Sequence, residues 1–468
     1  MSEVLEVWLY GTRVAEIERG ANQRLALRFT DDARRRFGPT SAILSVSLAI
    51  RREPYSNALT RNFLDGLLPE GDARGRIARE LELHDEDTFG LVRELGRDSA
   101  GALMIQPDGG PRPLSLARRE ARAIDENEVA RRLVALPTSP LGVDHYVRLS
   151  LAGEQRKLVL VRREDGGWAL PADGIPSTHI LKPQHQNSDW SHTVENEAYA
   201  MQLAKVVGLN VASVAVVDIG GQRVLVVERF DRTTENGQIE RVHQEDFCQA
   251  FGLRPRDKYQ SSGGPSLRKV ADALSRYSGN RDVAELLRLT TFNVAVGNAD
   301  AHGKNVALLH RPDGSLELAP AYDVMSTTFY PDLDQTLGMY VDGVRNITKV
   351  TPDRLVNEAV QWGMDRDEAS HVVTETLTRA TEAYHDSLLS FEEAVPFAKA
   401  VGRRAEQMLE TTLRDSRAAL PGADEIVLGP TERLETHPVH DAAEWTRVSY
   451  EPDVEELEAN RDVEGPTH

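Results

Sequence analysis

A polar loop in the second half of the chain carries side chains suited to group transfer. The stretch Val296-Gly-Asn-Ala-Asp-Ala-His-Gly-Lys-Asn305 places Asp300 five positions before Asn305. An aspartate in a loop can accept or orient the proton of an attacking hydroxyl, and an asparagine carbonyl is an oxygen ligand of the kind that Mg²⁺ prefers. The loop therefore holds one candidate base and one candidate metal ligand.

An expected hairpin follows directly and ends in a third residue of this kind. Two apolar runs, 306–309 and 316–321, are separated by Pro312-Asp-Gly-Ser315. That tetrapeptide is a turn signal, because Pro presets φ and Gly accepts positive φ. The second run leads into Tyr322-Asp323. We therefore expect Asp323 to converge with the Asp300 loop at one end of a two-stranded hairpin.

This order of residues is the layout of protein kinases. In those enzymes a loop Asp orients the hydroxyl, an Asn five positions later binds a metal ion, and an Asp after the next hairpin binds the metal ions that bridge the phosphates. Here Tyr322-Asp-Val324 stands where those kinases have Asp-Phe-Gly. Polar loops before hairpins also occur in proteins without catalytic function. Asp300 and Asn305 alone leave both interpretations open, and Asp323 favours the kinase.

Two features further upstream could hold phosphates. Gly153 lies between strand-like runs, but the segment 148–157 matches neither a Walker A motif nor Gly-x-Gly-x-x-Gly, so the pattern alone favours a simple turn. Lys182 ends the apolar run 178–181. A strand lysine after a glycine loop is the kinase arrangement for holding phosphates, and an exposed lysine at a sheet edge is the alternative.

The region between Lys182 and residue 232 also fits a kinase sheet lobe. Glu197 lies on an expected helix, 195–207, and could either pair with Lys182 or be a solvated carboxylate. Two β-branched runs end at Glu228-Arg-Phe-Asp-Arg232, which is the place where a two-lobed kinase crosses between its lobes and its backbone meets adenine.

Hydrophobic periodicity predicts strands first and helices later, with the candidate catalytic residues at the join. This order indicates an α+β, two-lobed protein-kinase-like fold with an added N-terminal α+β subdomain and a mainly helical C-terminal lobe. The expected strands are 4–10, 14–17, 24–29, 102–105, 158–161, 178–181, 211–217 and 224–227. The expected helices are 57–68, 73–83, 86–95, 126–135, 195–207, 243–251, 266–275, 282–296, 352–362, 366–388 and 391–413.

The length of 468 residues predicts two or three domains. Shifts in composition predict five consecutive segments. They are an N-terminal subdomain, a linker with a helix, a sheet lobe with a phosphate loop, a helical catalytic lobe and an acidic tail. These segments are 1–110, 111–145, 146–232, 233–418 and 419–468. From Pro421 onward there are 13 acidic and 3 basic residues, so we expect the tail to be disordered.

Composition also limits the compartment and the partners. The net charge of −19 argues against the whole chain being a surface for nucleic acid. A single cysteine, Cys248, cannot form an internal disulfide, which fits a reducing compartment. The first residues do not form a signal peptide, and no apolar run approaches the roughly 20 residues that span a bilayer. We expect a cytoplasmic protein without membrane partners.

Taken together, these stretches resemble the HipA kinases, the toxins of bacterial type II toxin–antitoxin pairs. The resemblance extends from the N-terminal hairpin to about residue 410, and its motifs are specific in combination. They are Glu94-Leu-Gly-Arg-Asp-Ser-Ala-Gly-Ala102, Ser150-Leu-Ala-Gly-Glu-Gln-Arg-Lys157, Thr178-His-Ile-Leu-Lys182, Val227-Glu-Arg-Phe-Asp-Arg232, Gln244-Glu-Asp-Phe-Cys-Gln249, Lys258-Tyr259, the Asp300 loop and Tyr322-Asp323.

The resemblance implies a serine/threonine protein kinase that uses ATP and Mg²⁺. It implies as substrates aminoacyl-tRNA synthetases, notably the glutamyl enzyme. It implies as partner a small helix-turn-helix antitoxin, HipB-like, which binds operator DNA with the toxin as corepressor. Carried over by position, Asp300 is the catalytic base, Asn305 and Asp323 bind Mg²⁺, and Ser150 is the autophosphorylation site. The nucleotide-binding positions implied are Ala152, Gly153, Glu154, Gln155, Arg156, Lys157, Lys182, Glu228, Arg229, Phe230, His302, Gly303, Lys304, Asn305, Tyr322 and Asp323.

The sequence departs from the family in one loop, and two other functions stay open as alternatives. Glu154 and Arg156 place opposite charges in a loop where the family has Ala and Glu, and an added carboxylate near phosphates could weaken ATP binding unless Arg156 neutralises it. A catalytically weak corepressor would keep the fold to bind an antitoxin. A small-molecule phosphotransferase would share the Asp300 and Asn305 spacing but not the Ser150 loop. The intact set of Asp300, Asn305, Asp323 and Lys182 favours an active kinase.

Overall fold

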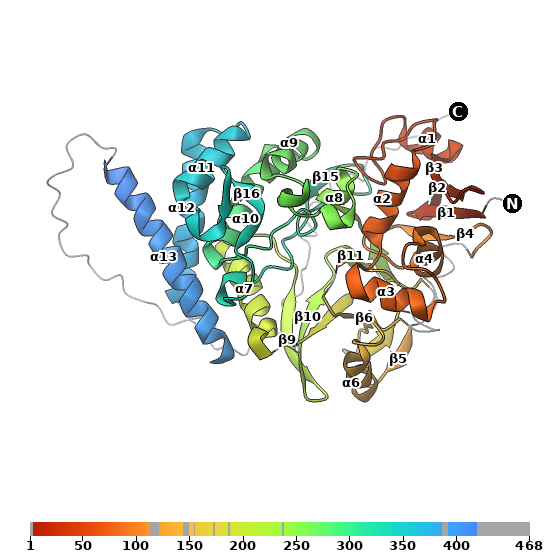
Figure 1. The fold of residues 1–468 in the computed structure, drawn as a ribbon, viewed down its shortest axis with the longest axis horizontal. Helices are drawn as coiled ribbons and strands as arrows, with labels where there is room; N and C mark the ends of the chain where they lie inside the picture. The colour runs from red at the N-terminus through yellow and green to blue at the C-terminus, as the bar shows by residue number, and fades with distance from the viewer. Residues whose placement is uncertain are drawn as a thin grey trace, which may run out of the picture. The chain divides into compact units, whose positions relative to one another are not determined.

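The computed structural model describes residues 3–111, 121–143, 149–153, 155–171, 174–185, 188–235, 238–385 and 392–418. Its first part is a four-stranded antiparallel sheet in the order β3-β2-β1-β4 (Figure 1). The apolar side chains of Leu5, Val7 and Leu9 in β1 are buried on one face of the sheet, because successive side chains of a strand point to opposite faces. The strands are β1 (Glu3–Leu9), β2 (Thr12–Arg19), β3 (Leu25–Phe29) and β4 (Met104–Pro107).

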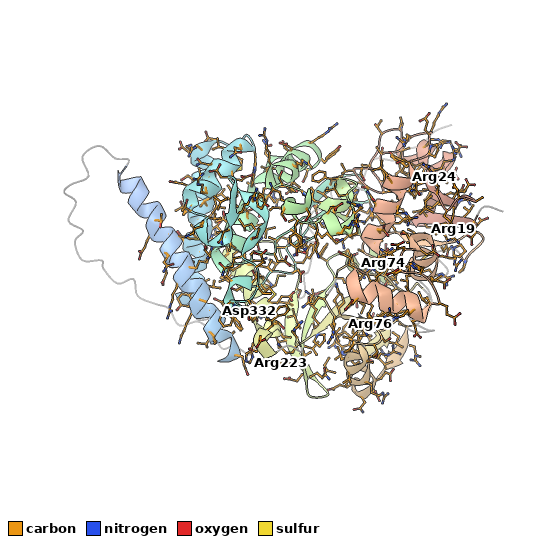
Figure 2. The ribbon with its side chains drawn as sticks, viewed as in Figure 1. Arg19, Arg24, Arg74, Arg76, Arg223 and Asp332 are labelled. Atoms are coloured by element: carbon orange, nitrogen blue, oxygen red, sulfur yellow. The ribbon has the colours of Figure 1, made fainter. Side chains whose placement is uncertain are left out.

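Four helices accompany this sheet and are fixed by polar contacts as well as by packing. They are α1 (Asp31–Phe37), α2 (Asn57–Leu67), α3 (Gly71–Glu80) and α4 (Thr88–Leu95). Arg74 on α3 contacts Asp65 on α2 at 2.9 Å, and the Arg19 guanidinium lies 4.4 Å from the centre of the Phe89 ring. Figure 2 labels both arginines. These contacts hold the helices to one another and to β2.

The second sheet has six strands in the order β5-β7-β6-β8-β10-β9. They are β5 (Arg122–Ile124), β6 (Leu158–Arg162), β7 (Trp168–Leu170), β8 (His179–Pro183), β9 (Val214–Ile219) and β10 (Gln222–Glu228). β5 and the helix α6 (Glu126–Ala135) come from the segment 111–145, which we expected to be a linker with a helix. That segment instead adds a strand to the sheet lobe, and its residues 112–120 and 144–148 lie outside the described ranges.

Strand β10 joins the two main hydrophobic cores. Val224 and Val226 pack in the core that the sheet lobe shares with the N-terminal subdomain. Leu225 and Val227, on the opposite face, pack in the core of the helical lobe. The two-residue period of a strand thus places one β-branched run between both cores, and both faces of the sheet are covered.

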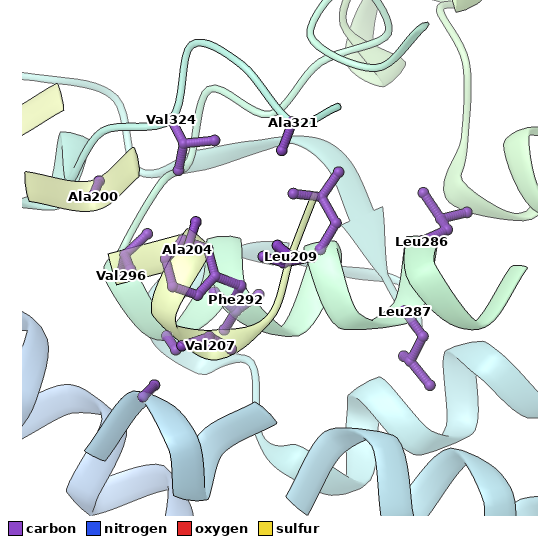
Figure 3. Packing of buried hydrophobic residues seen from close by; sticks show 14 of the residues in the cluster. Ala200, Ala204, Val207, Leu209, Leu286, Leu287, Phe292, Val296, Ala321 and Val324 are labelled. Atoms are coloured by element: carbon purple, nitrogen blue, oxygen red, sulfur yellow. The ribbon is translucent and has the colours of Figure 1, made fainter. Parts of the chain in front are cut away.

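In the helical lobe, α7 (Thr193–Val207) and α10 (Asn280–Val296) both pack against the helix 366–385. Figure 3 shows Ala200, Ala204 and Val207 of α7 in one cluster with Phe292 and Val296 of α10. The other helices are α8 (Phe247–Ala250), α9 (Leu267–Tyr277), α11 (Pro352–Gln361), α12 (Arg366–His385) and α13 (Val395–Ala418). No helix within the described ranges is long and apolar enough to cross a bilayer.

The chain after residue 232 is less helical than we expected. The segment 243–251, expected as one helix, is the strand β13 (His243–Asp246) followed by the short helix α8. β13 pairs with β14 (Ala307–His310), so a distant strand decides its conformation rather than local periodicity. The remaining strands are β11 (Arg232–Glu235), β12 (Gln238–Arg241), β15 (Leu316–Leu318), β16 (Thr336–Val341) and β17 (Val344–Asn346). The acidic tail, 419–468, lies outside the described residues.

A buried ionic network ties the N-terminal subdomain to the join between the lobes. Asp98 contacts Arg232 at 3.1 Å and Arg241 at 3.3 Å. Asp231 contacts Arg229 at 2.7 Å and Arg232 at 3.0 Å, and it also accepts a hydrogen bond from the Gly101 amide. Burial opposes ionisation of both aspartates, but the arginines outweigh it and hold the pKa of each below its usual range. The network is therefore fully charged at neutral pH.

We expect the substitution Asp231→Ala to destabilise the protein strongly. It would leave Arg229 and Arg232 buried without their shared counter-charge, which costs about 3–5 kcal/mol of unfolding free energy. The exposed pair of Asp165 with Arg163 provides the control, because Asp165→Ala should change stability by about 1 kcal/mol at most. Urea unfolding would measure both, and equal effects of the two substitutions would contradict this account.

The same network predicts how stability depends on pH. Both aspartates have a folded-state pKa below the unfolded value of about 4. Their contribution is therefore present above pH 4 or so, and it is lost as the pH falls toward the lowered values.

Candidate active site

The Asp300 loop begins where α10 ends. Gly297 closes the helix with φ 77°, a left-handed conformation that favours glycine. A Cβ at this position would lie 2.1 Å from the Thr328 hydroxyl, so the close approach also requires glycine. Inside the loop the Asn305 amide donates to the Asp300 carbonyl at 3.0 Å. The two residues predicted from their five-residue spacing are thus joined directly, and the Asp300 side chain is exposed to the cleft.

Asp323 reaches the same cleft between two buried neighbours. Ala321 accepts a hydrogen bond from the Ala212 amide and donates one to the Asn210 carbonyl. Ala321 and Val324 pack on α7 and α10 (Figure 3). Asp323 itself has φ 58°, in the left-handed region that Asp tolerates better than most residues. Its side chain is 41% exposed, so the carboxylate is available from the cleft.

Lys182 connects the sheet lobe to this aspartate. Its ammonium lies 2.6 Å from Glu197 Oε1 and 2.5 Å from Asp323 Oδ1. Glu197 is buried, so the pairing with Lys182 is observed and the solvated alternative is wrong. Lys182 is itself buried on β8, between β6 and β10, and is not an exposed lysine at a sheet edge.

Lys182, Glu197 and Asp323 form a triad in which each side chain affects the ionisation of the others. Burial opposes ionisation of Asp323, but Lys182 outweighs it and the pKa falls to about 2. Burial opposes the charge of Lys182 as well, and its two carboxylate partners, Asp323 before Glu197, raise the pKa above the usual value. For Glu197 burial is the larger effect and the pKa is raised. Asp323 and Lys182 therefore stay charged throughout the neutral range.

We call the glycine loop around Gly153 the cradle, because its described backbone lies against the ammonium of Lys157. Gly153 has φ 109°, and a Cβ there would lie 2.8 Å from Lys157 Nζ. Lys157 donates to the Ala152 carbonyl at 2.7 Å. Burial and then the charge of Lys182 lower the pKa of Lys157 to about 8, so an incoming anion would strengthen its positive charge. Gln155 and Arg156 also line the cleft, whereas Glu154 lies outside the described residues.

The join between the lobes supplies an aromatic face. The rings of Phe230 and Tyr322 lie 5.4 Å apart at 34°, and both line the cleft with Glu228. The Arg229 side chain does not serve this surface, because its guanidinium is held by Asp231, Ser177 and the Ser99 carbonyl. Only the backbone of Arg229 remains as a candidate contact to a ligand.

Three predicted residues between Asp300 and Asn305 have mainly structural contacts. The Gly303 amide donates to the Lys258 carbonyl at 3.1 Å, and a Cβ there would lie 2.5 Å from the Pro265 ring. Lys304 donates to Asp246 at 2.7 Å. Burial and then Lys258 lower the pKa of His302 to about 4, so its imidazole is neutral at pH 7.

Two acidic residues of the cleft were not predicted. Asp246 caps α8 through a capping box with Gln249, and the same carboxylate binds Lys304. Glu70, from the N-terminal subdomain, lies 3.6 Å from Lys304 and 3.9 Å from Lys258. The capping pattern could have identified Asp246. Nothing local could have placed Glu70, because the sequence Pro69-Glu70-Gly71 indicates only the end of a helix.

Ser150 is buried in this conformation. Its side chain and backbone are 1% exposed, and its hydroxyl donates to the Leu67 carbonyl at the end of α2. Its amide donates to the Asp98 carbonyl at 2.8 Å. The segment that precedes Gly153 is thus attached to the N-terminal subdomain, and a reaction at Ser150 requires that attachment to open.

The assembled residues fit a magnesium nucleotide. The cleft encloses about 1190 Å³ and is lined by the cradle, the lysines, the aromatic face and the Asp300 loop. In kinases Mg²⁺ is held by one or two protein oxygens and by phosphates, and Asn305 and Asp323 offer such oxygens here. Among the described residues, His, Cys, Asp and Glu form no group of three that could hold a metal ion.

Comparison with known proteins agrees with this geometry. The model of the HipA N-terminal domain matches residues 5–106, and the model of the HipA-like C-terminal domain matches residues 149–384. The chain is 37% identical to the putative kinase Y4mE of Sinorhizobium fredii over 86% of this chain and 98% of the relative. It is 34% identical to the serine/threonine-protein kinase toxin HipA of Shewanella oneidensis over 72% and 78% of the respective chains.

A solved structure shares the whole architecture. The complex of HipA, HipB and operator DNA from Shewanella oneidensis contains a chain that matches with a TM-score of 0.75 and 28% identity. The match covers 90% of this chain and 100% of the other. This confirms the two-lobed kinase-like fold with its added N-terminal subdomain. By sequence and by structure, the chain belongs to the HipA family.

Proposed function

We propose that this protein is an ATP-dependent serine/threonine protein kinase and the toxin of a toxin–antitoxin pair. The observation that carries the proposal is the ion-paired set of Lys182, Glu197 and Asp323 in the cleft that also holds Asp300. Kinases need a strand lysine, its helix glutamate, a metal-binding aspartate and a loop aspartate at one site. The same set argues against a catalytically weak corepressor, which would not need it.

Each residue has a definite role in such a reaction. Lys182 and Lys157 hold phosphate oxygens, and the cradle around Gly153 offers backbone amides without the obstruction of a Cβ. Phe230 and Tyr322 provide the surface for the base. Asn305 and Asp323 would hold Mg²⁺, which neutralises charge on the transferred phosphoryl group when it is bound. Asp300 orients the hydroxyl of the acceptor and takes its proton.

The partners are proposed from kinship. Its relative in Shewanella oneidensis is named a toxin kinase, and the structural neighbour was solved with HipB and operator DNA. We propose that the present protein likewise binds a small helix-turn-helix antitoxin. Through that antitoxin it would contact operator DNA and act as corepressor of its operon. The proposed substrate is an aminoacyl-tRNA synthetase of the glutamyl type, whose phosphorylation would arrest translation and growth in the cytoplasm. Incubation with γ-labelled ATP and a cell lysate would identify the labelled protein.

We expect Asp300→Asn to abolish most phosphoryl transfer while Mg·ATP still binds. General-base catalysis contributes about 10²–10⁴-fold, and the amide cannot accept the proton. The matched control is Asp332→Asn, which changes an exposed carboxylate on the same lobe (Figure 2). Phosphate transfer to a substrate and calorimetric titration with Mg·ATP measure the two properties. Transfer at a near wild-type rate would remove Asp300 from its assigned role.

We expect Asp323→Ala and Asn305→Ala to lose the part of nucleotide affinity that depends on Mg²⁺. Asp323 is ionised at every working pH because its pKa is about 2, so its charge is present throughout the titration. The measurement is calorimetry with ATP, once with Mg²⁺ and once with a chelator. The variants should bind metal-free ATP and show little gain when Mg²⁺ is added. An unchanged gain in Asp323→Ala would exclude that residue from the metal site.

We further propose that Ser150 is phosphorylated by the protein itself and that the modification prevents ATP binding. A phosphate adds about −1.5 to −2 charges. The buried position against the Leu67 carbonyl cannot hold it, so the segment must leave and the cradle would be lost. Mass spectrometry after incubation with Mg·ATP should find phosphate on Ser150, and the modified form should titrate with weakened nucleotide affinity. Ser150→Ala should keep its affinity after the same incubation, and ATP binding that survives modification would refute the switch.

A further inference from the structure

The dipeptide Lys258-Tyr259 lies against the Asp300 loop, and none of the roles assigned above uses its tyrosine. The Tyr259 hydroxyl donates a hydrogen bond to Asp300 Oδ1 at 2.8 Å. The Tyr259 ring meets the His302 ring edge to face, with centroids 5.0 Å apart and planes at 85°. One tyrosine therefore contacts two side chains of the catalytic loop, one through its hydroxyl and one through its ring.

The backbone around Tyr259 is fixed on several sides. The Tyr259 carbonyl accepts hydrogen bonds from the amides of Ser262 and Gly264, both at 2.9 Å. A Cβ at Gly264 would lie 2.6 Å from that carbonyl and 2.4 Å from the Asp257 carbonyl, so the turn closes only with glycine. The next residue, Gln260, accepts from the Tyr340 amide of β16 at 2.7 Å. The turn is thus locked to itself and to the neighbouring hairpin.

The turn is also bonded to the loop that it faces. The Lys258 carbonyl accepts from the Gly303 amide at 3.1 Å, and Lys258 Nζ lies 3.9 Å from Glu70 of the N-terminal subdomain. Gly303 has no space for a side chain beside Pro265. Tyr259 therefore keeps its place relative to Asp300, because both stand on backbone segments that are hydrogen-bonded to each other.

Asp300 needs such support, since its carboxylate projects from a loop into an open cleft. Hydrogen bonds from Asn305 and to Asn298 fix the Asp300 backbone but leave the side-chain torsions to other contacts. A carboxylate has two oxygens, and a donor on one of them sets the direction of the other. A base that is displaced by about 1 Å loses much of its effect, so the orientation of this group matters for rate.

We propose that Tyr259 is a positioning residue of the catalytic aspartate. Its hydroxyl holds Oδ1 of Asp300, and the second oxygen is thereby directed to the hydroxyl of the protein that accepts the phosphate. This inference rests on the proposed kinase function. Tyr259 has no role in binding nucleotide or metal in this proposal. Removal of its hydroxyl should therefore slow the transfer step and leave the binding of Mg·ATP unchanged.

The test is Tyr259→Phe, which removes the hydroxyl and keeps the ring on His302. The matched control is Tyr277→Phe, which removes a tyrosine hydroxyl at the end of α9, away from the cleft. Transfer of labelled phosphate from Mg·ATP to the chain itself and to lysate proteins is measured under saturating nucleotide. The rate should fall about 10–100-fold in Tyr259→Phe, the range for losing a hydrogen bond to a charged group, and stay unchanged in the control. Calorimetric affinity for Mg·ATP and the melting temperature should match the wild type.

A second comparison separates positioning from a general weakening of the fold. In the Asp300→Asn background the hydroxyl has no carboxylate to orient, so adding Tyr259→Phe should lower the residual rate no further. A further loss in the double variant would overturn the proposal, as would an unchanged rate in Tyr259→Phe or a loss confined to nucleotide affinity. A wild-type chain that transfers no phosphate would refute the kinase function and this role together. An active wild type with an unaffected Tyr259→Phe variant would refute the role alone.

Discussion

The architecture depends on a buried network of charged side chains, in which each charge needs its partners for compensation. Asp98 and Asp231 share three guanidiniums, those of Arg229, Arg232 and Arg241, in a region from which water is excluded. Isolated charges would be too costly there, and removal of one partner leaves the others uncompensated. Asp98 comes from the N-terminal subdomain, whereas the others come from the join between the lobes and the hairpin after it. The subdomain is therefore part of the kinase fold, because without Asp98 the buried guanidiniums of Arg232 and Arg241 would lose a counter-charge.

A few residues connect this buried ionic network to the cleft. Phe230 lies between Arg229 and Asp231 in the chain, so its ring is presented to Tyr322 from a backbone that the network fixes. Tyr322 in turn precedes Asp323 and donates to the Lys304 carbonyl at 2.6 Å. On the other side, Ser150 is hydrogen-bonded to the carbonyls of Asp98 and Leu67, which attaches the glycine loop to the same subdomain. The proposed nucleotide surface, metal site and phosphate loop thus share one support.

Sequence predicted those parts of the site whose signals are local. The turn at 312–315 and the apolar runs beside it determine a hairpin, so the approach of Asp323 to the Asp300 loop followed from neighbouring residues. Lys182 and Glu197 were candidates, but their pairing depends on the packing of α7 against the sheet, which no local pattern specifies. The side chain of Arg229 is held by Asp231, two residues away, and by Ser177, which is distant in the sequence, so Arg229 stays a predicted nucleotide contact through its backbone alone. The conformation of 243–246 and the place of Glu70 have the same cause, since contacts distant in the sequence decide them.

The observed triad also indicates which part of the site is rigid and which part can adjust. An ammonium has three donors, so Lys182 can keep Glu197 and still bind an anion. Glu197 is buried on a helix packed in the core, whereas Asp323 is 41% exposed and stands at a left-handed position of a loop. The Lys182–Glu197 contact is therefore the fixed one. In the proposed function, Asp323 would turn from its lysine to a bound cation, while Lys182 would keep its contact with Glu197. The ion pair with Lys182 lowers the pKa of Asp323 and so keeps this aspartate ionised.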